Sequence, residues 1–130
     1  MTKEAVERPD HYQNASGVET VDIAEHLGFN LGNAYKYLDR AGKKDPAKHG
    51  EDLQKARWYI RRELARKDMP ALALPAAVNK MAVSVMAHTD AKPLWAMARV
   101  VRDWDGYGPS RVLLEHVVSA IHVELARMDA

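Results

Sequence analysis

The side chains that could carry chemistry are concentrated between residues 29 and 63, where they repeat at helical spacing. Residues three and four positions apart lie on one face of a helix. By that rule two groups form, one on each of two predicted helices: Asn33, Lys36, Tyr37 and Arg40, then Asp52, Lys55 and Tyr59. Guanidinium and ammonium groups hold phosphate, and phenol rings stack on bases. The combination therefore predicts a site for a phosphorylated aromatic ligand such as a nucleotide.

Two helices joined by a basic turn must position these side chains. The first is predicted to begin after Asn30 and to end at Gly42, because glycine adopts the left-handed turn that follows a helix. The second takes Asp45 as its N-cap and Pro46 as its first residue, and it extends to about Lys67. The pair forms a helical hairpin whose two polar faces are available to one ligand.

A shorter helix is predicted before this hairpin. Residues 16–19 form an S-x-x-E capping box, and the helix ends at Leu27, before Gly28. Glu19 and Asp22 lie one turn apart, so they could bind a divalent cation together. They are equally suited to the first turn of a helix, where the positive end of the dipole favours acids. The sequence leaves both interpretations open.

The C-terminal part of the chain predicts three more helices after a proline-bounded connector at residues 68–75. They span about 75–87, 93–104 and 110–128, and no alternating strand pattern persists in the sequence. We therefore expect an all-α fold of about six helices, in which a motif region at 1–67 and a helical region at 68–130 pack as one domain. The 75–87 helix is apolar on nearly every side, which favours burial and a homo-oligomer.

The two regions carry a hint of internal duplication. A leucine, an isoleucine and a Glu-Leu-Ala-Arg run of the motif region recur 61 positions later. The matching positions are Leu53 and Leu114, Ile60 and Ile121, and residues 63–66 and 124–127. The second copy lacks the polar face of the first, so we expect it to be a degenerate, structural half.

Composition restricts the functional classes. The chain of 130 residues has no cysteine, which excludes disulfides and thiolate chemistry, and no apolar run near the ~18 residues of a membrane helix. The N-terminus shows no apolar signal segment, so we expect a cytoplasmic protein without a membrane partner. Net charge is only +1, but residues 36–67 carry +6 between flanks of −4 and −1. This basic block favours a local anion site, although a solvated, charge-rich helix face has the same composition.

The same residues carry a resemblance to a known family. The pattern extends over roughly residues 9 to 64 and comprises His11, Tyr12, Glu19, Asp22, Gly32, Asn33, Lys36, Tyr37, Arg40, Gly42, Lys43, Lys44, Glu51, Asp52, Leu53, Lys55, Ala56, Trp58 and Tyr59. It resembles the SaV-like early proteins, a small phage family that includes a nucleoside monophosphate kinase without a P-loop. The resemblance implies a phage-encoded nucleotide-binding protein in the cytoplasm of an infected bacterial host. It does not cover the C-terminal half.

We assign three kinds of role to these residues. Nucleotide binding is assigned to His11, Tyr12, Asn33, Lys36, Tyr37, Arg40, Lys43, Lys44, Lys55 and Tyr59, with Trp58 as a further stacking candidate. If the protein is a nucleoside monophosphate kinase, Asp52 and Arg40 are catalytic and Mg²⁺ is the cofactor. Glu19 and Asp22 are then the candidate metal ligands. As a binding protein alone it needs no cofactor, and it could sequester a host nucleotide signal used in antiviral defence.

Two other functional classes are less favoured. Residues 38–44 end like a P-loop, but Tyr37 stands in place of the first glycine and Lys44 in place of the hydroxyl residue. A helix-turn-helix is the second alternative, because Gly28 and the following helix with Lys36 fit a weak version of that DNA-binding motif. The longer family pattern explains the same residues, so we do not expect nucleic acid as the partner.

Overall fold

The computed structural model describes residues 16–43, 45–69 and 71–129. Over these residues the fold is all-α, as the sequence predicts, with six α-helices, one 3-10 helix and no strand. The elements are α2 (Thr20–Ala24), α3 (Phe29–Arg40), η2 (Pro46–Lys48), α4 (His49–Leu64), α5 (Ala76–His88), α6 (Lys92–Arg102) and α7 (Arg111–Met128). Within the same ranges, no helix is long and apolar enough to cross a membrane.

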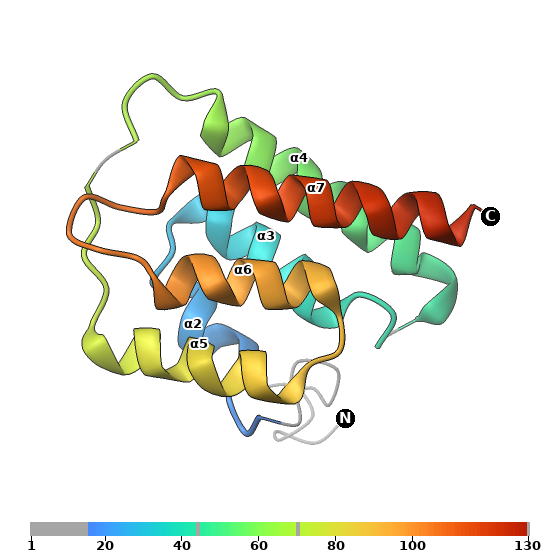
Figure 1. The fold of residues 1–130 in the computed structure, drawn as a ribbon, viewed down its shortest axis with the longest axis horizontal. Helices are drawn as coiled ribbons and strands as arrows, with labels where there is room; N and C mark the ends of the chain where they lie inside the picture. Colours follow the sequence, from blue (N-terminus) through green and yellow to red (C-terminus); the bar gives the residue numbers. More distant parts are fainter. Residues whose placement is uncertain (1–15, 44, 70, 130) are drawn as a thin grey trace, which may run out of the picture.

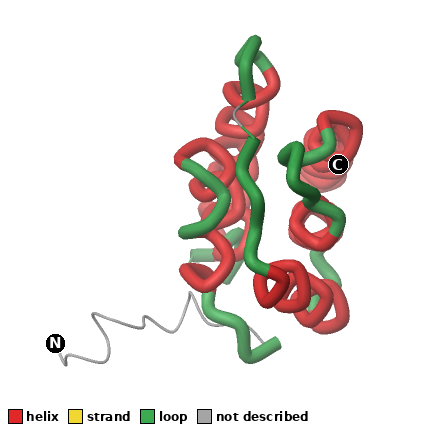
Figure 2. Tube along the Cα trace, turned by 90° about the vertical axis from the view of Figure 1, so that its left-hand side faces the viewer, coloured by secondary structure: helices red, strands yellow, loops and turns green. Residues whose placement is uncertain are grey.

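The helices form two layers (Figures 1 and 2). One layer contains α2, α3 and α4, and the other contains α5, α6 and α7. Each helix of the first layer contacts its counterpart in the second, so that α2 meets α5, α3 meets α6 and α4 meets α7. Apolar side chains from both layers belong to a single core cluster. The N-terminal and C-terminal regions therefore share one interior.

The two layers agree with the sequence repeat at individual positions. Leu53 and Ile60 of α4 are buried in the core, and so are Leu114 and Ile121 of α7. In both copies of the Glu-Leu-Ala-Arg run, the glutamate forms an ion pair with the arginine three positions later. Equivalent positions thus have equivalent environments, as expected of an internal duplication.

The start of α2 differs from the prediction. Its capping box is formed by Glu19 and Asp22, not by Ser16 and Glu19. The Ser16 hydroxyl instead accepts a hydrogen bond from the backbone N–H of Val18. The helix is also shorter than predicted, because the N–H groups of residues 26 and 27 bond to carbonyls three positions back and tighten the chain into a turn that contains Leu27.

Helix α4 of the hairpin and helix α6 of the second layer begin or end at residues other than those predicted. Asp45 caps a 3-10 turn through a bond from the Ala47 N–H, and α4 begins only at His49. It ends at Leu64 instead of near Lys67. In the second layer, α6 begins at Lys92, with residue 91 as its N-cap, and ends at Arg102, two positions before the predicted end.

Helix α5 is buried on one face only. Val78, Ala82 and Val85 lie in the core, and α5 packs against α6 and α2. Val83 on the opposite side is half exposed. In the single chain this side of α5 is open to solvent, and its burial in a homo-oligomer stays a prediction.

Two glycines set the geometry of the hairpin. A Cβ atom at Gly32 would lie 2.7 Å from the carbonyl oxygen of Ala24, so only glycine lets α3 pass so close to α2. Gly42 has φ of +77° and turns the chain after α3, as the sequence predicts. The two positions fix how α3 leaves α2 and how it turns toward α4.

Candidate functional site

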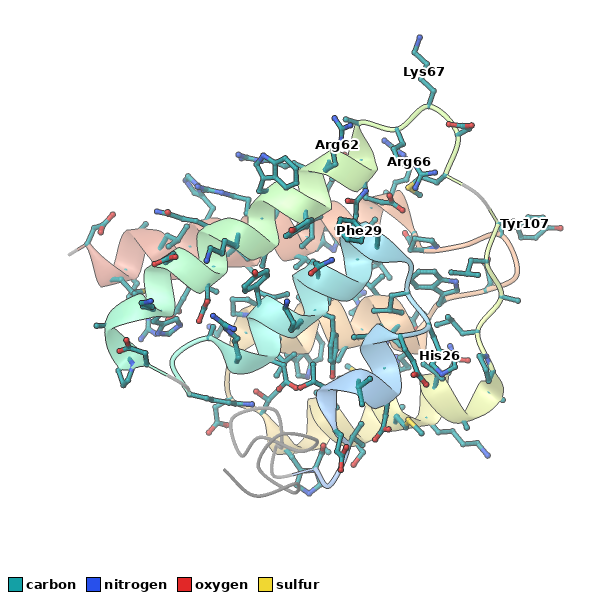
Figure 3. The ribbon with its side chains drawn as sticks, turned by 180° about the vertical axis from the view of Figure 1, so that it is seen from behind. His26, Phe29, Arg62, Arg66, Lys67 and Tyr107 are labelled. Carbon is teal, nitrogen blue, oxygen red and sulfur yellow. The ribbon has the colours of Figure 1, made fainter. Side chains whose placement is uncertain are left out.

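Helices α3 and α4 lie side by side and expose one continuous surface, which we call the α3–α4 face. Its side chains occur at helical spacing on both helices, and one more follows the end of α4: Phe29, Asn33, Lys36, Tyr37 and Arg40 on α3, Lys55, Trp58, Tyr59 and Arg62 on α4, and Arg66 just after it. The opposite sides of the two helices are buried, through Leu31 and Leu38 on α3 and Leu53 and Ile60 on α4. Core packing therefore fixes which side chains reach this face (Figure 3).

A cluster around the Tyr37 ring lies in the middle of the α3–α4 face. The rings of Tyr37 and Tyr59 are stacked, with centroids 6.1 Å apart and planes inclined by 10°. The Lys36 Nζ lies 4.7 Å from the Tyr37 centroid, the Arg40 Cζ 5.2 Å and the Lys55 Nζ 5.4 Å. The negative face of a phenol ring attracts cations. The two helices thus bring three cations to one aromatic platform.

The carboxylate of Asp52 orients one of these cations. Its Oδ1 accepts a hydrogen bond of 3.3 Å from the Arg40 Nε, and the Asp52 side chain is only 3% exposed. A carboxylate so buried does not reach a ligand on the surface. In this structure Asp52 positions the Arg40 guanidinium, so it is suited to a supporting role more than to the catalytic role predicted from the sequence.

Lys43 is held away from the cluster by a second buried carboxylate. Its Nζ lies 2.9 Å from Oδ1 of Asp39, which is 1% exposed. The other oxygen of Asp39 accepts a short hydrogen bond from the Thr20 hydroxyl of α2. Asp39 therefore joins α3 to α2, and Lys43 lies with it on that side of the hairpin.

Lys55 and Asn33 each have a local partner. The Lys55 ammonium lies 2.9 Å from the Glu51 carboxylate one turn earlier. This hydrogen bond lowers the pKa of Glu51 and raises the pKa of Lys55, so both groups stay charged across the neutral range. The Asn33 amide donates to the Phe29 carbonyl at 2.8 Å. Lys55 thus enters the cluster as part of an ion pair.

Glu19 and Asp22 serve the start of α2. The backbone N–H of Glu19 donates to the Asp22 carboxylate at 3.0 Å, and the Glu19 carboxylate accepts from the backbone of Asp22 in return. Among the described residues no group of three or more histidine or acidic side chains could hold a metal ion. The geometry therefore matches the helix-capping interpretation of these two acids. His11, Tyr12 and Lys44, which the sequence also assigns to nucleotide binding, lie outside the described residues.

Two exposed aromatic side chains lie against Tyr59, and one of them was not predicted from the sequence. Phe29 is 76% exposed and Trp58 is 60% exposed, and each ring contacts Tyr59 edge-on. Trp58 is a stacking candidate in the sequence, but Phe29 is not. Its spacing of four and eight residues from Asn33 and Tyr37 is the signal that identifies it as part of the same face.

Comparison with known proteins identifies one family model. Residues 6–61 match a family described as a protein of unknown function, DUF3310. The match includes α2, α3 and most of α4, and therefore the α3–α4 face up to Arg61, but none of the second layer. No curated protein matches the chain. No solved structure matches it.

Proposed function

We propose that this protein binds a nucleotide on the α3–α4 face. The observation that supports the proposal is the cluster of Lys36, Arg40 and Lys55 around the Tyr37 ring. Arg40 and Lys55 are paired with Asp52 and Glu51, but the three cations outnumber these two carboxylates, and a phosphate group would neutralise the remaining positive charge. The arrangement therefore favours an anionic ligand at this point of the surface.

The aromatic side chains favour a ligand that also carries a base. Trp58 contacts Tyr59 edge-on and leaves most of its own ring in solvent. An exposed indole ring can stack on any base, since every base has a π face. A phosphate at the Tyr37 cluster and a base on Trp58 would use both properties of the face in one ligand.

Binding is favoured over phosphoryl transfer. A kinase that transfers a phosphoryl group needs carboxylates that hold Mg²⁺ or the acceptor hydroxyl. Asp52 is buried beside Arg40, and Glu19 and Asp22 cap α2. Nucleoside monophosphate kinase activity and sequestration of a nucleotide signal nevertheless share the same surface, so the experiment must test both.

The helix-turn-helix alternative has less support. Its recognition helix would be α3, but α3 packs against α2, α4 and α6. Tyr35, in the middle of α3, is fully buried. A recognition helix needs a solvent-exposed face that enters the major groove. Helix α3 is exposed only where it forms part of the α3–α4 face.

Two further parts of the proposal rest on the sequence. The resemblance to a phage family supports an origin in a phage and action in the cytoplasm of an infected bacterium. The apolar composition of α5 supports a homo-oligomer, because Val83 stays half exposed in the single chain. Light scattering at micromolar concentration tests the oligomer, and a strict monomer would contradict it.

Calorimetric titration with nucleoside mono- and triphosphates and with cyclic dinucleotides tests the binding site. Lys36→Ala and Lys55→Ala are each expected to weaken binding by about tenfold or more, because each removes a hydrogen bond to a charged group worth roughly 1.5–3 kcal/mol. Lys80→Ala on α5 is the matched control, since it removes an exposed lysine from the second layer. Unchanged affinity in both site variants, or no binding of any nucleotide, would remove the proposal.

Chromatography after incubation with ATP, Mg²⁺ and each nucleoside monophosphate distinguishes the two activities. A kinase yields a nucleoside diphosphate. A sequestering protein depletes the free nucleotide and releases it unaltered after heat denaturation. We expect the second result, because the described carboxylates near the site already have structural partners.

A further inference from the structure

The cationic and aromatic side chains of the α3–α4 face continue beyond the Tyr37 cluster toward the C-terminal end of α4. Lys55, Tyr59 and Arg62 follow one another at spacings of four and three residues, so they form a stripe along one side of α4, and Arg66 comes just after the helix ends at Leu64. Lys67 extends this stripe past the end of the helix. Figure 3 shows Arg62, Arg66 and Lys67 at the same end of the hairpin as Phe29.

A buried carboxylate fixes the far end of this stripe. Glu63 is 8% exposed, and its Oε1 accepts hydrogen bonds from the Asn30 amide and from the Arg66 guanidinium, both at 3.1 Å. Asn30 is the neighbour of Phe29 at the start of α3. Glu63 therefore ties Arg66, just beyond the end of α4, to the first turn of α3, which also contains Phe29.

We propose that the α3–α4 face binds a single-stranded oligonucleotide of several nucleotides. The proposal rests on the proposed nucleotide site and extends it: the Tyr37 cluster holds one nucleotide, and the stripe to Lys67 holds those that follow. A single nucleotide would use only one end of the surface. The Phe29 ring and the cations Arg62, Arg66 and Lys67 would then have no part in binding.

The length of the surface sets the size of the ligand. Arg40 contacts Asp52, and from Asp52 to the last residue of α4, Leu64, the helix rises by about 1.5 Å per residue, or roughly 18 Å, with Arg66 and Lys67 beyond it. Nucleotides stacked as in one strand of a duplex rise by about 3.4 Å each, so the surface has room for roughly six. This length lies within the range of about 4–16 nucleotides that single-strand-binding domains cover.

The charges along the surface favour a polyanion. Its cations are Lys36, Arg40, Lys55, Arg62, Arg66 and Lys67, and its carboxylates are Glu51, Asp52 and Glu63. The net charge of this set is +3, and Arg62 and Lys67 form no ion pair among the described residues. A strand with one phosphate per nucleotide would therefore gain attraction at each end of the surface.

The aromatic rings decide between a single strand and other polyanions. Phe29, Trp58, Tyr59 and Tyr37 occur among the cations, in the manner of surfaces on which successive bases stack. A duplex keeps its bases paired and presents mainly phosphates, so it would not use these rings. An acidic protein segment would use the cations but has no flat π face for each ring.

Fluorescence polarisation with a labelled twelve-residue oligothymidylate tests the proposal, with unlabelled competitors of one, two, four, six and eight nucleotides. Affinity is expected to rise by about tenfold or more between one and six nucleotides and then to level off. Neutralising about three phosphates also predicts that log K falls with log salt with a slope near −2. A duplex of equal length and a polyglutamate peptide are expected to compete at least tenfold less well.

Two variants separate the far end of the surface from the Tyr37 cluster. Arg62→Glu/Lys67→Glu is expected to lower affinity for six nucleotides by at least tenfold and to leave single-nucleotide binding unchanged. Phe29→Ala is expected to lower the affinity for six nucleotides about fivefold or more, because a stacking contact is lost. Lys80→Glu/Lys92→Glu makes the same change of charge on the second layer and is expected to have no such effect.

The outcomes distinguish the oligonucleotide proposal from the proposed nucleotide binding on which it rests. Equal affinity for one and for six nucleotides would overturn the oligonucleotide proposal and leave the nucleotide site intact. Absence of binding at every length would overturn the oligonucleotide proposal, and only if no nucleotide binds in the calorimetric titration either would the nucleotide site fail as well. Equal competition by polyglutamate would assign the surface to an acidic protein, and equal competition by duplex would assign it to double-stranded DNA. Either result would overturn the proposal.

Discussion

The ion pair between Arg40 and Asp52 predicts an asymmetric response to mutation. The Asp52 carboxylate is 3% exposed, and the Arg40 side chain is 16% exposed. Two unit charges at the 3.3 Å distance of this pair attract by about 5 kcal/mol at an effective dielectric constant of 20. Burial of both charges costs several kcal/mol, so the net contribution of the pair to stability is small.

Removal of one partner alone has a much larger effect. Arg40→Met leaves a carboxylate buried without its cation, and we expect it to lower the free energy of unfolding by about 3 kcal/mol. Asp52→Leu leaves the long Arg40 side chain, which can turn toward solvent, so we expect the free energy of unfolding to fall by only about 1 to 2 kcal/mol. The double variant should lose only about 1 to 2 kcal/mol, because an apolar pair of similar volume replaces both charges. The sum of the two single losses minus the loss in the double variant gives a coupling energy of roughly 2 to 4 kcal/mol.

Urea denaturation followed by circular dichroism at pH 7 measures all four proteins of this cycle. The slope of the unfolding free energy against urea should stay constant, which confirms that the variants differ in stability alone. Losses below about 1 kcal/mol in both single variants, or losses that add in the double variant, would refute the positioning role of Asp52. A larger loss in Asp52→Leu than in Arg40→Met would refute the argument from burial.

Two further predictions concern glycine and tyrosine positions of the hairpin. Gly32→Ala is expected to lower the free energy of unfolding by about 1 to 3 kcal/mol, since the new Cβ would lie 2.7 Å from the Ala24 carbonyl. Gly50→Ala, the matched control on α4, should raise it by about 0.5 to 1 kcal/mol, because its Cβ meets only ordinary contacts; chemical denaturation checks both. Tyr35→Phe should be at least as stable as the wild type at pH 7, because the buried hydroxyl has no hydrogen-bond partner within the described ranges. Burial, and secondly nearby carboxylates, raises the pKa of Tyr35 above that of an ordinary phenol. The wild type therefore loses stability as pH rises above about 10, because the tyrosine then ionises in the unfolded chain but not in the folded one. Thermal unfolding from pH 7 to 11 should increasingly favour Tyr35→Phe over the wild type, and a constant difference between the two would contradict this.

Much of the fold was predictable because its signals are local. Ser110 precedes α7, and its hydroxyl accepts from the Leu113 N–H as an N-cap does. Gly42 turns the chain after α3. Such capping and turn preferences depend on a few neighbouring residues, and they give the helix positions to within a few residues.

The shared polar side of the hairpin was predictable for a similar reason. The spacing of Lys36, Tyr37 and Arg40 places them on one side of α3, and Lys55 and Tyr59 have the same relation on α4. The structure brings all five together around the Tyr37 ring. Their part in nucleotide binding stays a prediction, since spacing determines neighbours and not ligands.

By itself, therefore, the sequence determined an all-α chain, the approximate helices and the side chains that share each helix face. Only the tertiary structure decided which faces are covered. The buried carboxylates Asp39 and Asp52 resemble ordinary surface acids in the sequence, and each becomes a structural partner because a neighbouring helix excludes water from it. The period of a helix defines its sides, but the helix that packs against each side, and hence the charge that is buried there, depends on residues far away in the chain.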